Sequence, residues 1–594
     1  MPDPRPTGDP ADPGPTPPDA PAAPPSTPTP PAAAPASPAA PAPPGAAVPA
    51  HPTAPAVQPY PAPVPVPPSF FARRWPAPAA PAGPAALLAI AGAAVGAAIF
   101  TPLGGVGIGW PLAGACVLGA VVAVARTGPL DPADRRARLG WSAAALALLS
   151  VLAFRNAWWL VAFCVLGALG CTALAIVGGR SIRGIAFGLL GAPLAAVRGL
   201  PWLGRTLLAP AGRGGTGGEG VDRRAATVRR VVVATLGTLG VLIVFGGLLA
   251  SADAAFDELL SRVLPDITAA TVFSGGFLLA AGGLIALAGA FTAAAPLDRG
   301  GLESPGAPRL GRWEWAAPTG ALVLLFAGFV AVQATALFGG RKHLAATAGL
   351  SVAEYARGGF WQLAVVTVLT LLVLLAITRW ARREDAGDRA LLRWLLGPLC
   401  LLSLVIVASA LGRMYVYQQV YSFTGERIFV MAVEGVLGLV FVLVLVAGLR
   451  GDGRWIPRAI VALQVAMLLA LAALNPEGYA ARRNLDRYER DGVIDLWYVR
   501  ALSADAAPAL AELPADLRRC ALGKLPSRLG GPERWYEWNL GRHRARAVLR
   551  EIRPTLRGES NPCRMAPAYD HPVRRPIGAA AVTGPAAPPA DRGR

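Results

Sequence analysis

The feature that most constrains this chain is a series of apolar runs, each near 20 residues long, between residues 85 and 474. Short polar loops separate these runs. An apolar run of that length spans the hydrocarbon core of a bilayer as an α-helix. The composition agrees, because 54% of the residues are hydrophobic and only 15% are charged, whereas a soluble domain carries about a quarter charged residues. We therefore predict an all-α, polytopic transmembrane helix bundle.

About 11 spans are predicted, in a first helix group (85–230) and a core membrane domain (231–474). They cover residues 85–103, 108–125, 139–154, 157–177, 231–250, 271–291, 316–338, 360–378, 394–412, 428–448 and 459–474. The run from 182 to 208 is broken by Pro193 and Pro201 and contains three arginines. Because these residues make it too polar to cross, we predict that it lies along the membrane surface.

The orientation follows from the basic residues in alternate loops. The loops after the even-numbered spans hold 24 Arg and Lys residues, and those after the odd-numbered spans hold seven. Basic loops stay in the cytoplasm, so we predict a cytoplasmic N-terminus and, with eleven spans, an extracytoplasmic C-terminus. Four arginines soon after the last span oppose this orientation: Arg482, Arg483, Arg487 and Arg490.

The two ends of the chain have a composition that cannot form a core. Residues 1–84 contain 32 of the 59 prolines, interleaved with Ala, Ser and Thr, and residues 565–594 return to Pro, Ala and Gly. Such segments bury too little apolar surface to fold. We predict disordered tails, of which the first is either an interaction arm or a plain solvated extension.

The net charge of +19 raises the question of a nucleic-acid partner. All but two of the basic residues are arginine, a bias that, beside abundant Ala, Gly and Pro, is typical of a GC-rich bacterium. These arginines are scattered through loops rather than gathered on one face. They therefore predict membrane topology in a bacterial plasma membrane, and no nucleic-acid binding.

Polar and aromatic residues gather in the loops predicted to face outward. We predict ligand or coupling residues here: Asp253, Tyr355, Arg357, Arg413, Tyr417 and Arg427. Glu434 is the one carboxylate clearly inside a predicted span, about two turns below its outer end. A carboxylate at that depth usually finds a partner or a water-filled cavity. It forms either an ion pair with Arg413, Arg427 or Arg357, or part of a coupling site.

Residues 475–564 are predicted to form a small extramembrane helical region. Asn475 and Asp495 lie among its aromatic side chains, which line a ligand cleft or pack at the membrane interface. Cys520 and Cys563 are its only cysteines. An extracytoplasmic location would permit a disulfide between them, although two unpaired buried cysteines are an alternative.

Seven segments carry a family resemblance. They are SADAAF (251–256), FVAVQATALFGG (329–340), AEYARGGFWQL (353–363), SALGRMYVYQQVYSFTGERIF (409–429), NPEGYAARRNLDRY (475–488), DLWYVRALSADAAPAL (495–510) and RWYEWNLGR (534–542). In this order they resemble the bacterial polytopic membrane family catalogued as domain of unknown function 4173, over about residues 230–550. The sequence departs from it at Glu477 and Ala254. The resemblance implies a membrane fold and no established activity.

The usual catalytic signatures are absent from the sequence. It has no HExxH, CxxC, P-loop or GxSxG motif, and its four histidines include no pair at metal-binding spacing. We predict no cofactor and no metal. The favoured hypothesis is a non-enzymatic protein that transports or senses a solute at the outer face, with the bilayer and a small ligand or a protein as partners. The alternatives are an enzyme acting on an envelope lipid or glycan through Asp253, Glu434 or Asp495, and a scaffold for partner proteins.

Overall fold

The computed structural model describes residues 75–208, 269–297, 309–338, 352–556 and 563–564, apart from 103, 127–130, 383–384 and 532, together with isolated positions between 230 and 253. Across these residues the ordered elements are helices, and the sole β contact is one isolated bridge between Leu310 and Ala381. The predicted all-α helix bundle is confirmed. The tails predicted to be disordered, other than residues 75–84, lie outside the described residues.

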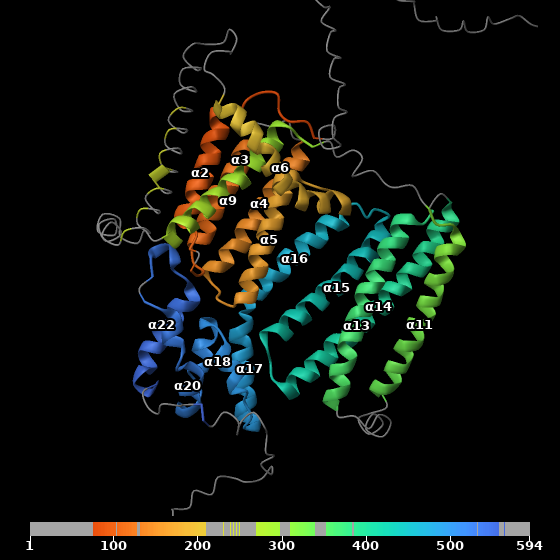
Figure 1. The fold of residues 1–594 in the computed structure, drawn as a ribbon. Coiled ribbons are helices and arrows are strands. Elements are labelled where there is room, and N and C mark those ends of the chain that lie inside the picture. Colours follow the sequence, from red (N-terminus) through yellow and green to blue (C-terminus); the bar gives the residue numbers. More distant parts are fainter. Residues whose placement is uncertain are drawn as a thin grey trace, which may run out of the picture. The chain divides into compact units, whose positions relative to one another are not determined.

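The first helix group contains α2 (Pro84–Phe100), α3 (Gly109–Ala125), α4 (Pro132–Ser150), the 3₁₀ turn η1 (Val151–Ala153), α5 (Trp158–Val177), α6 (Ile182–Leu208) and α9 (Ala269–Ala294). In Figure 1, α2, α3 and α9 lie side by side, and α4 packs on α5. Small residues allow this closeness, because a Cβ at Gly282 of α9 would collide with Ala97 of α2.

The second helix group contains α11 (Arg312–Phe338), α13 (Val352–Trp380), α14 (Ala386–Tyr421) and α15 (Gly425–Arg450). α14 packs against α11, α13 and α15 around Leu399, Phe360 and Phe441. α16 (Ile456–Leu474) lies between the two groups and contacts α15 on one side and α4 and α5 on the other (Figure 1).

In the described part of the chain, nine helices are long and apolar enough to cross a membrane: α4 with η1, α5, α6, α9, α11, α13, α14, α15 and α16. α2 and α3 are apolar but shorter, at 17 residues each. Ten of the eleven predicted spans therefore coincide with helices. The predicted span at 231–250 falls among residues that the structure describes only at isolated positions.

α6 differs from the other long helices because both of its ends contact the same end of the bundle. It begins just after α5 ends, and near its far end Trp202 donates to the Ala80 carbonyl and Thr206 accepts from the Ala82 backbone, just before α2 begins. The short α2–α3, α3–α4 and α4–α5 connections place the start of α2 and the end of α5 at one end. This geometry favours the surface location predicted for residues 182–208, although length and composition alone would allow α6 to cross.

The structure describes the last ten residues of the predicted tail, 75–84, and they pack on the bundle. The Trp75 side chain is fully buried against Phe291, and its indole nitrogen donates to the Ala295 carbonyl at 2.7 Å. Arg198 of α6 donates to the Trp75 carbonyl. A single large aromatic side chain thus anchors a proline-rich stretch that composition alone describes as unable to form a core.

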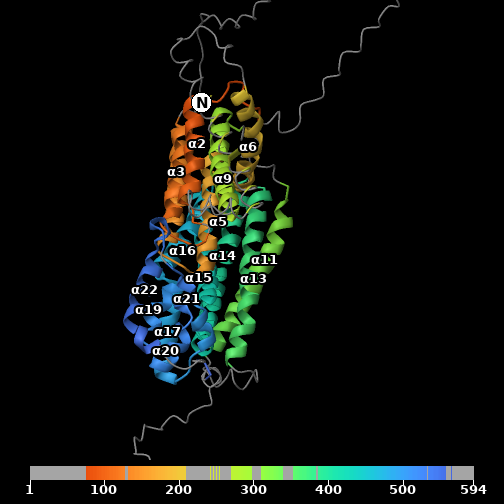
Figure 2. The same cartoon turned by 60° about the vertical axis from the view of Figure 1, so that its left-hand side comes forward.

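The C-terminal region, residues 475–564, is a small helical body beside the bundle (Figure 2). Its elements are α17 (Pro476–Asp491), α18 (Leu496–Ala501), η2 (Ala504–Ala506), α19 (Ala507–Leu510), α20 (Ala515–Leu522), α21 (Leu525–Leu529), η3 (Trp535–Glu537), α22 (Leu540–Ile552) and η4 (Arg553–Leu556). They enclose their own core around Leu496, Leu510 and Leu522. Cys520 and Cys563 form a disulfide bond across this core, with their Cα atoms 4.9 Å apart.

Candidate functional site

The C-terminal region packs on one end of the bundle, against four helix connections. In the loop before α3, the Ile108 nitrogen donates a hydrogen bond to the Trp538 carbonyl. In the α4–α5 connection, the Asn156 nitrogen donates to the Asp505 carboxylate. In the α14–α15 connection, the Phe423 nitrogen donates to the Asn484 side chain. At the fourth, α16 continues into α17 at Asn475. These are loops whose composition predicted an outward location, so the structure brings several of them to a single face.

Asp505 is the centre of the largest polar network on this face. Its carboxylate accepts hydrogen bonds from the backbone nitrogens of Asn156 (2.5 Å) and Ala157 (3.3 Å) and from the Asn156 side chain (3.1 Å). Gly541 of α22 lies directly against it, because a Cβ there would collide with the carboxylate. Burial raises the pKa of Asp505 above its ordinary value, opposed by its bonds to Asn156.

Asn539 closes the same network from the start of α22. Its amide oxygen accepts from the Asn156 side chain at 2.6 Å and from the Arg542 backbone at 3.1 Å, which caps the helix. Its amide nitrogen donates to the carbonyls of Leu152 and Arg155. The side chain is fully buried, and all its hydrogen-bonding groups are used.

Arg155 completes the contact between the bundle and the C-terminal region. It donates to the carbonyls of Ala472 (2.6 Å) and Ala473 (3.4 Å), in the last turn of α16, where carbonyls lack partners within the helix. Burial lowers the pKa of Arg155, Asp505 raises it, and the nearby Arg544 lowers it. The guanidinium therefore binds a helix end while facing another cation.

These residues surround the junction cavity, a cavity of about 310 Å³. It is lined by Arg155, Asn475, Arg482, Ala504, Asp505, Pro508, Ala509, Gly541 and Arg544. Asn475 has left-handed backbone geometry (φ 55°), accepts from Gly478 at the start of α17, and donates to the Asp505 carbonyl. Of the predicted site residues, only Asn475 lies at this cavity.

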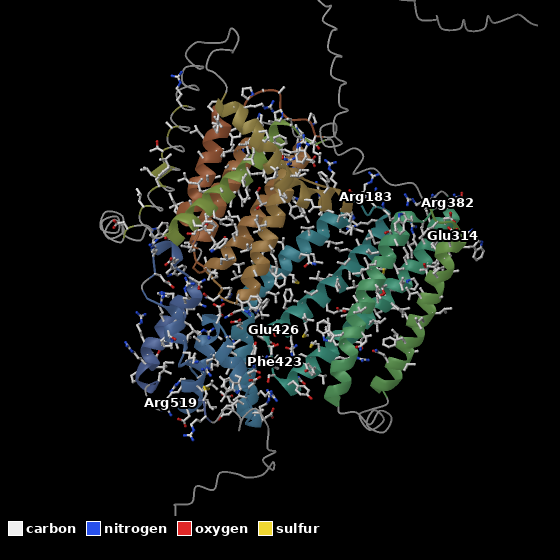
Figure 3. All side chains as sticks on the ribbon, viewed as in Figure 1. Arg183, Glu314, Arg382, Phe423, Glu426 and Arg519 are labelled. Atoms are coloured by element: carbon white, nitrogen blue, oxygen red, sulfur yellow. A yellow bond between two sulfur atoms is a disulfide. The ribbon has the colours of Figure 1, made fainter. Side chains whose placement is uncertain are left out.

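A second set of contacts ties the α14–α15 connection to the C-terminal region. The Asn484 side chain bonds both the nitrogen and the carbonyl of Phe423, and the Tyr498 hydroxyl accepts from the Gly425 nitrogen at 2.8 Å. Burial raises the pKa of Tyr498. Figure 3 labels Phe423 on this connection and Glu426 in the first turn of α15. The contacts fix the beginning of α15.

The seam cavity lies beside this connection, where α13, α14 and α15 meet, and measures about 250 Å³. Its lining is mainly aromatic and apolar, with two charged residues: Phe360, Trp361, Met414, Tyr417, Glu426, Arg427 and Val430. The Arg427 guanidinium lies 4.6 Å from the centre of the Tyr417 ring and donates to the carbonyls of Tyr421 and Ser422. Two predicted site residues, Tyr417 and Arg427, therefore line one cavity.

Glu434 lies one turn below Val430 in α15 and is only 2% exposed. Its carboxyl oxygen accepts from the Thr367 hydroxyl of α13 at 3.0 Å. No ion pair of Glu434 occurs among the described side chains, so the predicted pairing with Arg413 or Arg427 is wrong. The reason is depth: the Arg427 guanidinium turns back to the carbonyls at the end of α14, away from Glu434.

The remaining predicted residues are dispersed. The Arg413 guanidinium lies against Gly359, where a Cβ would collide with it. Tyr355 and Arg357 belong to the first turns of α13, and their side chains are outside the described ones. Asp253 is exposed, with its backbone nitrogen bonded to Leu249. Asp495 accepts from the Tyr498 nitrogen and caps α18, which is a structural role.

The three residues of the polar network beside the junction cavity, Asn156, Asp505 and Asn539, were not among the predicted site residues. Their signals were present but weak: Asp505 and Asn539 lie within two of the quoted segments, and Asn156 follows an apolar run. The bonded pairs Asn156–Asp505 and Asn156–Asn539 are 349 and 383 residues apart. Spacing along the chain therefore could not bring them together.

The described residues hold no cluster of three His, Cys, Asp or Glu side chains that could bind a metal ion.

No curated protein and no solved structure matches the chain. A family model described as a domain of unknown function, DUF4153, matches residues 143–513. The resemblance to domain of unknown function 4173 is therefore wrong. Its segments consist largely of small and aromatic residues at helix ends, which many membrane proteins share, and it left out α4 and α5, which the match includes. With more than half of its length matched, from α4 into the C-terminal region, the chain belongs to the DUF4153 family of integral membrane proteins of unknown function.

Proposed function

We propose that this protein binds a small solute in the seam cavity and transports or senses it without chemical change. The observation that carries the proposal is the arrangement along the α13–α15 contact. An aromatic cavity containing Arg427 and Glu426 lies above a buried carboxyl, Glu434, whose partner among the described side chains is one hydroxyl. Ionisable groups at such positions in membrane proteins commonly belong to substrate or proton pathways.

The cavity lining indicates the chemical class of the solute. Phe360, Trp361 and Tyr417 offer flat apolar surfaces, and Arg427 and Glu426 offer one charge of each sign at the outer rim. A guanidinium has five N–H donors, so Arg427 retains donors beyond the carbonyl bonds made by one of its nitrogens. An amphipathic solute with an apolar body and a charged head, such as an aromatic or branched amino acid, matches this lining.

Depth along the helices supports a coupling role for Glu434. Thr367 follows Phe360 by two helical turns, which is about 10 Å at 1.5 Å per residue. The Glu434–Thr367 pair thus lies directly inward from the cavity on the same two helices. Gln418 adds a polar group nearby: it donates to the Met431 sulfur, and its buried amide oxygen has no hydrogen-bond partner among the described residues.

We also propose the orientation and the membrane. The face bearing the C-terminal region is extracytoplasmic, the N-terminus is cytoplasmic, and the membrane is a bacterial plasma membrane. The disulfide between Cys520 and Cys563 supports this orientation, because disulfides persist in oxidising compartments. The Arg-rich loops at the opposite end support it as well. Alkaline phosphatase fused after residue 594 should be active, and green fluorescent protein fused there should be dark. The reverse result would reject the orientation.

The enzyme hypothesis receives less support from the described residues. Asp495 is used as a helix cap, and neither cavity contains Asp495 together with Glu434. The scaffold hypothesis concerns the proline-rich tail, which lies outside the described residues. We therefore base the test on solute binding and flux.

The test uses purified protein in proteoliposomes that contain a pH-sensitive dye. Aromatic and branched amino acids are added outside, and internal acidification and thermal stabilisation are measured. We expect stabilisation by at least one solute, and its loss in Arg427→Gln and Trp361→Leu. Trp394→Leu, which removes an exposed tryptophan of α14 outside the cavity, is the matched control. Acidification that is lost in Glu434→Gln indicates coupled transport, and binding without flux indicates sensing. Absence of both binding and flux rejects the proposal.

A further inference from the structure

The junction cavity carries an excess of positive charge that the seam cavity lacks. Arg155 comes from the α4–α5 connection, Arg482 from α17 and Arg544 from α22. Within the described residues, neither Arg482 nor Arg544 forms an ion pair, whereas Arg542 and Arg546 of the same helix both pair with Glu533. In α22, Arg542 and Arg546 thus share one carboxylate, whereas Arg544 at the cavity has no ion-pair partner among the described residues.

The carboxylate in the cavity wall does not neutralise these cations. Asp505 is a single acid among three guanidinium groups, and its oxygens are engaged by three donors of Asn156 and Ala157. Glu477 lies nearby, but its carboxylate accepts from the Ser503 nitrogen and is 6% exposed. The space between Arg155, Arg482 and Arg544 therefore attracts an anion.

The level of the cavity relative to the bundle indicates which anions reach it. Arg155 binds the last carbonyls of α16, at the end of a membrane-spanning helix. Its neighbours Phe154 and Trp158 are 46% and 75% exposed. Exposed aromatic residues at span ends mark the interface with the lipid headgroups. The cavity therefore lies at the depth where phosphate groups are concentrated.

We propose that the junction cavity binds a phosphate-bearing anion between Arg155, Arg482 and Arg544. Guanidinium groups bind phosphate through two parallel N–H···O bonds, and several together hold a doubly charged group. Arg155 is oriented for this by its bonds to Ala472 and Ala473. A volume of about 310 Å³ accommodates inorganic phosphate or the headgroup of one phospholipid. This site is separate from the seam cavity, so it stands or fails independently of solute binding there.

The test compares two pairs of substitutions in the full-length protein. Arg482→Gln with Arg544→Gln removes two cavity charges from exposed side chains, which leaves the Asp505 network intact. Arg490→Gln with Arg550→Gln removes the same charge from the same two helices outside the cavity. Calorimetry with inorganic phosphate is performed in neutral detergent. We expect the cavity pair to weaken binding by roughly tenfold or more, since charge-assisted bonds dominate it, and the control pair to leave it unchanged.

A second arm identifies the source of the phosphate. Protein from phosphatidylglycerol nanodiscs is released into the mass spectrometer, and the lipids that stay bound are counted. If the cavity pair loses retained lipid and the control pair does not, the site binds a lipid headgroup. If the cavity pair loses phosphate binding but keeps its lipid, the site binds the free ion. Equal behaviour of the two pairs in both arms, or no binding by the unaltered protein, overturns the proposal.

Discussion

The two cavities on the same face of the bundle are built in opposite ways. The junction cavity is walled by arginines and by a network of buried amides and one carboxylate, and it exists only because the C-terminal region packs on the bundle. The seam cavity is walled by side chains of three neighbouring helices, with aromatic rings from α13 and α14, and Arg427 is held by carbonyls at the end of α14. The polar network at the junction cavity depends on docking of the C-terminal region, whereas the seam cavity is walled by bundle helices and touches that region only through the beginning of α15 in the described residues. Changes to the C-terminal region should therefore separate the two.

Binding at the two cavities should differ most after loss of the disulfide, in the double variant Cys520→Ser with Cys563→Ser. The disulfide closes a segment with a sequence separation of 43, for which loss of the cross-link costs about 4 kcal/mol by chain entropy. Limited proteolysis should then cleave the C-terminal region much faster, and binding at the junction cavity should weaken. Solute binding at the seam cavity should weaken less, because four of its seven lining residues belong to α13 and α14. Equal cleavage rates with and without the disulfide would contradict this expectation.

The second effect is smaller and more local. Asn539→Ala removes four hydrogen bonds and leaves buried donors and acceptors of Asn156 and Leu152 without partners. Each such group costs about 1–3 kcal/mol, so we expect about 3 kcal/mol of lost stability in denaturant unfolding of the C-terminal region. As a control, Glu489→Ala on the exposed face of α17 should cost less than about 0.5 kcal/mol.

The stability of the C-terminal region, which forms one wall of the junction cavity, should also depend on pH. Burial raises the pKa values of Asp505 and Glu477 above their ordinary 3.8 and 4.5. Because the folded state then holds protons that the unfolded state releases, stability is complete below these ordinary values and is lost as pH rises through the folded ones. The slope reaches about 1.4 kcal/mol per pH unit for each proton. Unfolding of the C-terminal region followed between pH 4 and 8 should show this decline, and Asp505→Asn with Glu477→Gln should flatten it. A slope unchanged by these substitutions would argue against buried carboxyls as its source.

The smallest effect concerns the carboxyl beneath the seam cavity. Thr367→Val keeps the side-chain shape and removes the hydroxyl that bonds Glu434. Hydrogen bonds between membrane helices average about 0.6 kcal/mol, so thermal stability should change little. Solute-driven acidification should change strongly if Glu434 couples transport, and Thr370→Val, which removes a hydroxyl bonded within its own helix, should not alter it. If Thr367→Val and Thr370→Val gave identical flux, the hydrogen bond to Glu434 would have no role in coupled transport.

The same contrast explains what could be predicted from the sequence. Helix periodicity is local, and it indicated ten of the helices, while loop composition grouped Tyr417 and Arg427, which the structure places in one cavity lining. The partner of Glu434 was missed because it depends on the depth at which α13 crosses α15. The Asn156–Asp505–Asn539 network depends on docking between distant segments, which no spacing records.

α16 gives the two cavities a mechanical relation. It packs on α15, which lines the seam cavity, and passes without an intervening loop, through Asn475, into α17, which lines the junction cavity. Its 19 residues form a rod of about 28 Å. A tilt of roughly 5° about the end near Ile456 would displace Asn475 by about 2 Å. Any such change in the tilt of α16 would therefore alter the wall of the junction cavity together with the packing against α15, which lines the seam cavity.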